Sequence, residues 1–244
     1  MKPASNPLSQ APMPLRQAIV AIDGPSGVGK STLSKLLASE LGFVNLDTGA
    51  MYRAVALAVA RRGLDPGDAT ALGRLADASA IEFVRNAGSE RVLLDGEDVS
   101  AAIRTPEISL LTSRISACPA VREALVRKQR ELCAQGGFVL EGRDIGTVVF
   151  PDAEVKFFLV ASAAERGSRR FLELQAKGVA VDLAKTVAEV ETRDNNDSSR
   201  AHSPLYRAAD AIEIDTTNRG IDQVLTEMLR IIRLRQLATG PCRE

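Results

Sequence analysis

The chain has 244 residues, enough for one α/β domain with a small insertion. Basic and acidic residues number 31 each, aromatic residues make up 4%, and no apolar run could span a bilayer, so neither nucleic acid nor a membrane is an expected partner. Three scattered cysteines (Cys118, Cys133 and Cys242) argue against a disulfide framework or a zinc site and favour the reducing cytoplasm.

The predicted elements begin after an N-terminal tail. Residues 1–16 carry four prolines and no apolar segment, which is typical of a disordered tail and not of a signal peptide. Residues 17–23 form a short apolar run that predicts a buried parallel strand, and leucines at helical spacing predict a helix over 30–41. The next elements predicted are a short strand and two helices, over residues 43–46, 50–62 and 69–79.

An antiparallel segment interrupts this strand–helix series. Two apolar stretches, 81–85 and 91–95, flank a turn-rich cluster and predict a hairpin, with a third short strand over 97–99. Alternation then resumes, with helices over 106–117, 119–135, 163–177, 183–194 and 221–237, and strands over 138–141, 155–160 and 211–215. The pattern predicts an α/β protein in which helices cover both faces of a parallel sheet. We expect a core over 17–75 and 111–238, an insertion over 76–110, and a C-terminal tail over 239–244.

The turn after the first strand reads Gly-Pro-Ser-Gly-Val-Gly-Lys-Ser over residues 24–31, which fits the phosphate-binding P-loop pattern. It follows a predicted strand and opens a predicted helix, as the motif requires. The glycines let backbone N–H groups face a phosphate, Lys30 can reach the β- and γ-phosphates, and the Ser31 hydroxyl can ligate Mg²⁺. The expected ATP site comprises Gly24, Pro25, Ser26, Gly27, Val28, Gly29, Lys30, Ser31 and Thr32.

The rest of the sequence favours a kinase among P-loop proteins. A GTPase would carry an Asn-Lys-x-Asp segment, which is absent, and residues 138–141 match the acid-ended strand of an assembly ATPase only weakly. Arginines instead lie near glycines and hydroxyls in four segments, 47–53, 141–147, 166–170 and 193–200. Arginine clamps phosphate oxygens, and phosphoryl transfer needs charge cover more than a strong base. The only histidine, His202, is interpreted as a surface residue.

These segments together resemble the bacterial cytidylate kinase family. The shared motifs are the P-loop and residues 47–53, 96–100, 103–105, 121–124, 141–151, Arg193–Asp194, Asp197 and Arg200. Family members often have serine in place of Thr48, and some have aspartate in place of Glu141, so the hydroxyl and the carboxylate are kept. The resemblance implies a P-loop NTPase-type sheet, an NMP-binding antiparallel insertion, and a helical lid at about 163–180.

The resemblance also implies an activity: transfer of the γ-phosphate of ATP to CMP or dCMP, with Mg²⁺, by a cytoplasmic monomer. Another small-molecule P-loop kinase, with UMP, AMP or shikimate as acceptor, remains open, as does a nucleotide-dependent switch or assembly ATPase. An RNA-binding protein is disfavoured by the balanced charge and the low aromatic content.

The resemblance assigns the acceptor nucleotide to ten residues: Thr48, Tyr52, Arg53, Ser113, Arg122, Arg143, Asp144, Arg193, Asp197 and Arg200. Arg53 and Arg143 are expected to hold the α-phosphate, and Arg193 and Asp197 the ribose. The base is expected at Ser113, Arg122 and Asp144, although Arg122 and Asp144 could pair with each other instead. Tyr52 lies in the apolar run 51–59, where a tyrosine is more often a core residue than part of a pocket.

Two arginines of the lid, Arg166 and Arg169, are also expected to bind ATP. The residues expected to take part in catalysis are Lys30, Arg143, Arg169 and Arg200. Ser31 is the expected Mg²⁺ ligand, with Asp47 and Glu141 as candidates for a second, carboxylate ligand. Each of these side chains could alternatively be solvated or form half of a structural ion pair.

Overall fold

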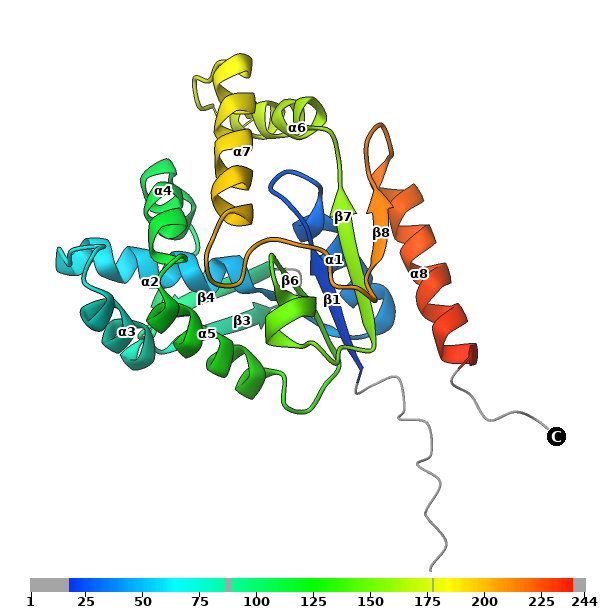
Figure 1. Cartoon of the computed structure of the whole chain (residues 1–244), viewed down its shortest axis with the longest axis horizontal. Coiled ribbons are helices and arrows are strands. Elements are labelled where there is room, and N and C mark those ends of the chain that lie inside the picture. The colour runs from blue at the N-terminus through cyan, green and yellow to red at the C-terminus, as the bar shows by residue number, and fades with distance from the viewer. Residues whose placement is uncertain (1–17, 87–88, 177, 239–244) are drawn as a thin grey trace, which may run out of the picture.

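The chain folds around a five-stranded parallel sheet (Figure 1). In this computed structural model the described residues are 18–86, 89–176 and 178–238. The strands lie in the order β2 (Val44–Asp47), β6 (Phe138–Gly142), β1 (Ile19–Asp23), β7 (Val155–Val160) and β8 (Ile212–Asp215). The expected parallel sheet is therefore confirmed. The two predicted tails and Cys242 lie outside the described residues.

Helices cover both faces of the sheet, as the sequence predicts. On one face, α1 (Lys30–Leu41) and α8 (Ile221–Ala238) pack around Phe157, whose side chain is almost fully buried. On the other face, α2 (Thr48–Arg62) packs against strand residues that include Leu46 and Leu140. Burying one such apolar side chain contributes roughly 1.5–3 kcal/mol. The two apolar layers hold the strands rigidly, and with them the ends of the strands.

Four helices differ from the prediction by two residues or more. The helices α4 (Pro106–Ile115) and α5 (Pro119–Leu132) end two and three residues early, and two others differ for identifiable reasons. The prediction starts a helix at residue 50, but α2 begins at Thr48, because the Asp47 side chain caps it by accepting the Ala50 N–H at 3.0 Å. The prediction ends another helix at residue 194, but α7 (Leu183–Ser198) continues for one more turn. Asparagine and aspartate favour turns over helix, and here tertiary contacts of the buried Asp197 side chain override that preference.

The predicted small antiparallel sheet is confirmed. It consists of β3 (Ile81–Asn86), β4 (Ser89–Leu94) and β5 (Glu97–Asp98). Its apolar face shares one hydrophobic cluster with the neighbouring helices α3 (Ala69–Ala78), α4 (Pro106–Ile115) and α5 (Pro119–Leu132). A 3₁₀ turn, Ala102–Arg104, leads into α4. The sheet thus rests on the helices beside it, and the exact limits of the insertion, 76–110, stay a prediction.

Two helices lie at the end of the parallel sheet where the strands terminate (Figure 1). These are α6 (Ala163–Ala176), which follows β7, and α7, which packs against α6. A π-helical segment, Ile145–Val149, follows β6 and was not predicted. The carboxyl end of the sheet is therefore surrounded by the P-loop, this π-helical segment and α7. Ligands of open α/β sheets bind at such an end.

Candidate active site

A single cleft of about 700 Å³ lies at the carboxyl ends of the strands. It is lined by both the P-loop and the arginine-rich segments. The expected site residues that line it are Ser26, Gly27, Gly29, Lys30, Ser31, Thr32, Thr48, Tyr52, Arg53, Ser113, Arg122, Arg143, Asp144, Arg169, Arg193, Asp197 and Arg200. Gly24, Pro25, Val28 and Arg166 are not in its wall. The fold brings together segments that are far apart in the sequence.

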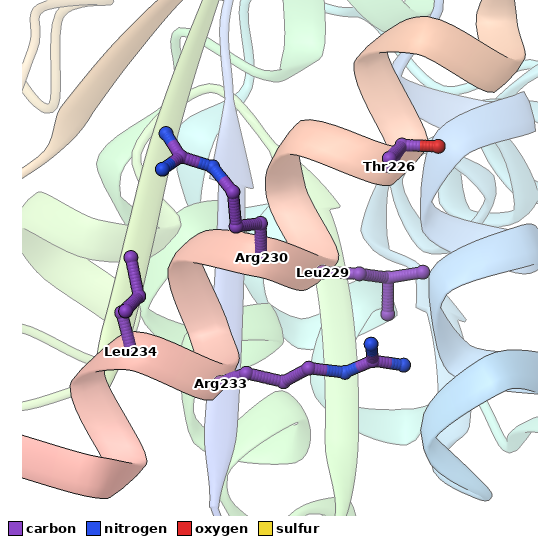
Figure 2. Close-up of a pocket in the computed structure, with 5 residues that line it drawn as sticks. All are labelled: Thr226, Leu229, Arg230, Arg233 and Leu234. Carbon is purple, nitrogen blue, oxygen red and sulfur yellow. The ribbon is translucent and has the colours of Figure 1, made fainter.

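A second hollow lies along the exposed side of α8, where Figure 2 shows the side chains that line it. They are Thr226, Leu229, Arg230, Arg233 and Leu234. All five come from one helix, and none is an acid, a thiol or an imidazole. This hollow therefore offers no set of catalytic groups, and the cleft at the strand ends is the candidate site.

The P-loop owes its shape to close backbone packing. Gly24 has φ of 147°, and a Cβ atom there would lie 2.3 Å from the Leu159 carbonyl oxygen, so no other residue fits without a shift. The Lys30 ammonium folds back over the loop and donates to the carbonyl oxygens of Gly24 at 2.8 Å and Pro25 at 2.6 Å. Burial, aided by Arg143, lowers the pKa of Lys30 well below its usual value. The negative charge of a bound phosphate would raise this pKa again and so stabilise the charged ammonium.

Hydroxyl and carboxylate oxygens meet beside the P-loop lysine. Ser31 Oγ donates to Glu141 Oε2 at 2.7 Å, and burial, followed by the charge of Asp47, raises the pKa of Glu141 to about 7. Mg²⁺ takes hard oxygen ligands and in kinases uses few protein groups beside phosphate oxygens. Within the described part of the chain no three His, Cys, Asp or Glu side chains form a metal cluster. The oxygens of Ser31 and Glu141 therefore fit a phosphate-bound Mg²⁺ and not a closed protein cage.

The acceptor half of the cleft is built from ion pairs. Arg143 Nε donates to Asp197 Oδ2 at 2.8 Å, and Arg200 pairs with the other oxygen of the same carboxylate. Although burial opposes its charge, Arg143 and Arg200 hold the pKa of Asp197 below its usual value. Arg122 pairs with Asp144, and both side chains are almost fully buried. The pairing of Arg122 with Asp144, one of the two possibilities that the sequence left open, is therefore present.

Two further arginines keep donors available for an anion. Arg193 has no ion-pair partner among the described residues, and burial, followed by the charges of Arg143 and Arg53, lowers its pKa to about 10. Arg53 donates to Ser109 Oγ at 2.8 Å, and burial lowers its pKa as well. Clustered guanidinium groups that lower one another's pKa favour a ligand with several negative charges.

The smaller expected residues line the same half. Tyr52 is 9% exposed, so it belongs to the core as well as to the cleft wall, and the Arg122 guanidinium lies 5.5 Å from its ring centre. Burial raises the pKa of Tyr52 to about 12, so it stays a neutral hydroxyl. Thr48 Oγ1 donates to the Glu141 carbonyl oxygen at 2.6 Å, which ties the start of α2 to β6.

The two expected lid arginines lie in different places. Arg169 lines the cleft, where it pairs with Glu165 at 2.9 Å and donates to the Thr216 carbonyl oxygen at 2.7 Å. Arg166 is buried behind the P-loop, donates to the Ser26 carbonyl oxygen at 3.1 Å and pairs with Asp194. The Asp194 carboxylate in turn accepts the Ser26 N–H at 3.1 Å. In this conformation Arg166 and Asp194 support the loop, and only Arg169 faces the cleft.

Several residues that line the cleft or contact its walls were given no role by the sequence analysis. They are Arg104 and Asp194, which lie in the shared motifs, and Asp23, Ser116, Arg219, Gly220 and Ile221, which do not. Among the latter, only Asp23 carried a usable signal, as an acid that ends an apolar strand directly before the P-loop. Ser116 accepts from Arg200 at 2.9 Å through its hydroxyl. Nothing local marks such a serine, because its partner is 84 positions away.

Comparisons with known proteins agree with this geometry. A family model described as cytidylate kinase matches residues 20–234. A cytidylate kinase of Syntrophotalea carbinolica is 62% identical over 94% of this chain and 97% of its own length. Those of Geobacter sulfurreducens and Lactobacillus gasseri are 58% and 50% identical, over 92% and 89% of this chain and 96% and 94% of their own lengths. In the part of the chain that the structure describes, no helix is both long and apolar enough to cross a membrane. The chain belongs to the cytidylate kinase family.

Proposed function

We propose that this protein transfers the γ-phosphoryl group of ATP to CMP or dCMP, giving ADP and CDP or dCDP. The observation that carries the proposal is the single cleft that joins the P-loop to an arginine cluster. A donor triphosphate on the P-loop and an acceptor monophosphate on the arginines would meet inside one cavity. Membership of the cytidylate kinase family supports the same acceptor.

On the donor side, the P-loop N–H groups and Lys30 hold the β- and γ-phosphates. Ser31 and Glu141, which share a hydrogen bond of 2.7 Å, hold Mg²⁺ together with phosphate oxygens, and Asp47 lies close enough to Glu141 to influence its charge. The metal, when bound, neutralises phosphate charge during transfer. The region at about 163–180 acts as a lid that brings Arg169 over the triphosphate and excludes water.

On the acceptor side, the monophosphate lies against Arg53 and Arg143, and the ribose against Arg193 and Asp197. Arg200 and Arg143 share the Asp197 carboxylate, and all three residues line the cleft. When the acceptor oxygen attacks the γ-phosphorus, these guanidinium groups cover the charge on the transferring group. No strong base is required, because the transition state for phosphoryl transfer is loose.

The base is read by Asp144 and Arg122, with Ser113 beside them. An ionised Asp144 can only accept, which suits the cytosine amino group, and Arg122 can only donate, which suits N3 or the 2-oxo group. Uracil would place its 4-oxo oxygen against the carboxylate and its N3–H against the guanidinium, and neither pair can form a hydrogen bond. Because the two side chains pair with each other, each buried charge has a partner of opposite sign.

An acceptor panel tests the proposal. ATP and Mg²⁺ are incubated with CMP, dCMP, UMP, AMP and shikimate in parallel, and ADP and the phosphorylated product are measured. We expect CMP and dCMP to give the highest kcat/KM. A preference for AMP, UMP or shikimate would contradict the proposal, and ATP hydrolysis without any acceptor would indicate a switch or assembly ATPase.

The cellular context completes the proposal. We expect the protein to act as a monomer in the cytoplasm and without nucleic acid. Gel filtration with light scattering, in the presence and absence of CMP, measures the molecular mass, and a dimer at micromolar concentration would contradict the expected monomer.

A further inference from the structure

Asp23 is a buried carboxylate that joins the two halves of the cleft. It is the last residue of β1, directly before Gly24 of the P-loop, and it is 4% exposed. Its Oδ1 accepts the Ile145 N–H at 2.8 Å, and its Oδ2 accepts the Gly146 N–H at 2.7 Å. These two N–H groups open the π-helical segment that directly follows Asp144.

Only a carboxylate satisfies this arrangement. The two N–H groups are buried and each needs an acceptor, and a carboxylate presents two acceptor oxygens where an amide presents one oxygen and one donor. Gly146 packs closely against the same carboxylate. A Cβ atom at position 146 would lie 3.1 Å from Lys156 Cδ, which is tight, and 3.4 Å from Asp23 Oδ2, which is an ordinary van der Waals contact. A side chain there would therefore press mainly on Lys156 and only lightly on Asp23.

A carboxylate occupies this position although burial disfavours its charge. Burial raises the pKa of Asp23 to about 6, the negative charge of Asp144 adds to this, and the two N–H groups and Lys30 oppose it. An apolar residue at the end of β1 would avoid this cost. Both ends of the connection are rigid, because Gly24 packs against the Leu159 carbonyl and the Ile145 side chain is buried in the core.

We propose that Asp23 is a positioning residue that sets the acceptor base relative to the donor phosphates. It does so by holding Asp144 through the backbone of Ile145 and Gly146. The inference rests on the proposed function, because it takes Asp144 to read the cytosine ring. Productive transfer depends on the distance and alignment of the two reacting groups, and small displacements lower the rate strongly. The carboxylate fixes the two binding loops to each other through its two hydrogen bonds.

The test is Asp23→Asn, which keeps the size of the side chain and replaces one acceptor with a donor facing an N–H. We expect the KM for CMP to rise at least tenfold and the CMP:UMP ratio of kcat/KM to fall. The KM for ATP should change less than threefold, because Lys30 keeps its two carbonyl partners. Asp68→Asn is the matched control, since Asp68 also accepts a backbone N–H, that of Ala71 at 2.9 Å, but is exposed and outside the cleft. Unchanged CMP kinetics in folded Asp23→Asn would overturn the inference.

A second variant covers the case in which Asp23→Asn does not fold. Gly146→Ala leaves the carboxylate in place and adds a Cβ atom 3.4 Å from Asp23 Oδ2 and 3.1 Å from Lys156 Cδ, so the segment shifts only slightly. We expect its KM for CMP to rise about threefold with an unchanged KM for ATP, and equal effects on both substrates would overturn the inference. The wild-type protein separates the two proposals. If it does not phosphorylate CMP, the proposed function fails. If it does and both variants keep its CMP kinetics, only the positioning role fails.

Discussion

The donor and acceptor halves of the cleft are built by different means. The P-loop is one continuous stretch, residues 24–31. Lys30 bonds to carbonyl oxygens of the same loop, and Arg166 and Asp194 support its backbone from behind. The acceptor half collects side chains from α2, α4, α5, the segment after β6, and α7, and its charges pair with one another. A backbone-built site holds its shape without a ligand, whereas a site built from side chains needs internal partners. Donor variants should therefore affect all acceptors equally, and acceptor variants should change which acceptor is used.

Removing the P-loop lysine tests the donor half most directly. Lys30→Ala is expected to lower kcat a hundredfold or more, because charge cover in the transition state is the main catalytic contribution. The CMP:UMP ratio should stay unchanged, since the acceptor half is intact. Steady-state kinetics with both acceptors measure this, and a folded variant with near wild-type turnover would contradict the donor role.

The pH dependence of stability tests the boundary between the halves, where Asp23 lies between Asp144 and Lys30. The pKa of Asp23 is about 6 in the folded protein, against an ordinary value of 3.8 that applies in the unfolded chain. As the pH rises, the unfolded chain therefore loses this proton first, which stabilises it relative to the folded protein. Wild type should therefore lose about 2–3 kcal/mol of unfolding free energy relative to Asp23→Asn between pH 4 and pH 6.5. The loss is complete above pH 6.5.

Urea unfolding of both proteins across this pH range measures the difference, and the contributions of all other groups largely cancel. A difference that stays constant with pH would show that burial does not raise the pKa of Asp23.

Removing the carboxylate that we propose reads the base tests the acceptor half. Asp144→Ala is expected to lower kcat/KM for CMP about thirtyfold and to shrink the CMP:UMP ratio, because a polar mismatch in a buried site discriminates strongly. The variant also leaves Arg122 without its carboxylate partner, so thermal unfolding is measured as a control for stability. A constant ratio in a folded variant would show that Asp144 does not read the base.

The smallest expected effect concerns the proposed lid. Arg169→Ala is expected to lower kcat/KM for ATP about tenfold, the size of one charge-assisted contact, and to leave the KM for CMP nearly unchanged. Arg74→Ala, on the exposed side of α3, is the matched control. An unchanged kcat and KM for ATP would count against the lid role. An equal rise in the KM for ATP and for CMP would show that Arg169 does not belong to the donor half alone.

The order of the elements was readable from the sequence because it depends on neighbouring residues. Apolar runs and helical spacing predicted all five parallel strands and the antiparallel hairpin to within about two residues. The π-helical segment 145–149 was missed, because its first N–H groups are held by Asp23, 122 and 123 positions away. The extra turn of α7 was missed for a similar reason, since Asp197 is held there partly by Arg143.

The sequence by itself determined the α/β order, the P-loop and, through its motifs, the residues that gather in the cleft. Only the tertiary structure decided which of those residues face a ligand and which support the wall. Arg166 and Arg169 are three positions apart on α6, yet Arg166 pairs with Asp194 behind the P-loop and Arg169 faces the cleft. Short-range patterns reflect backbone propensity, whereas the role of a charged side chain depends on its partners, and in this cleft most partners come from distant segments of the chain.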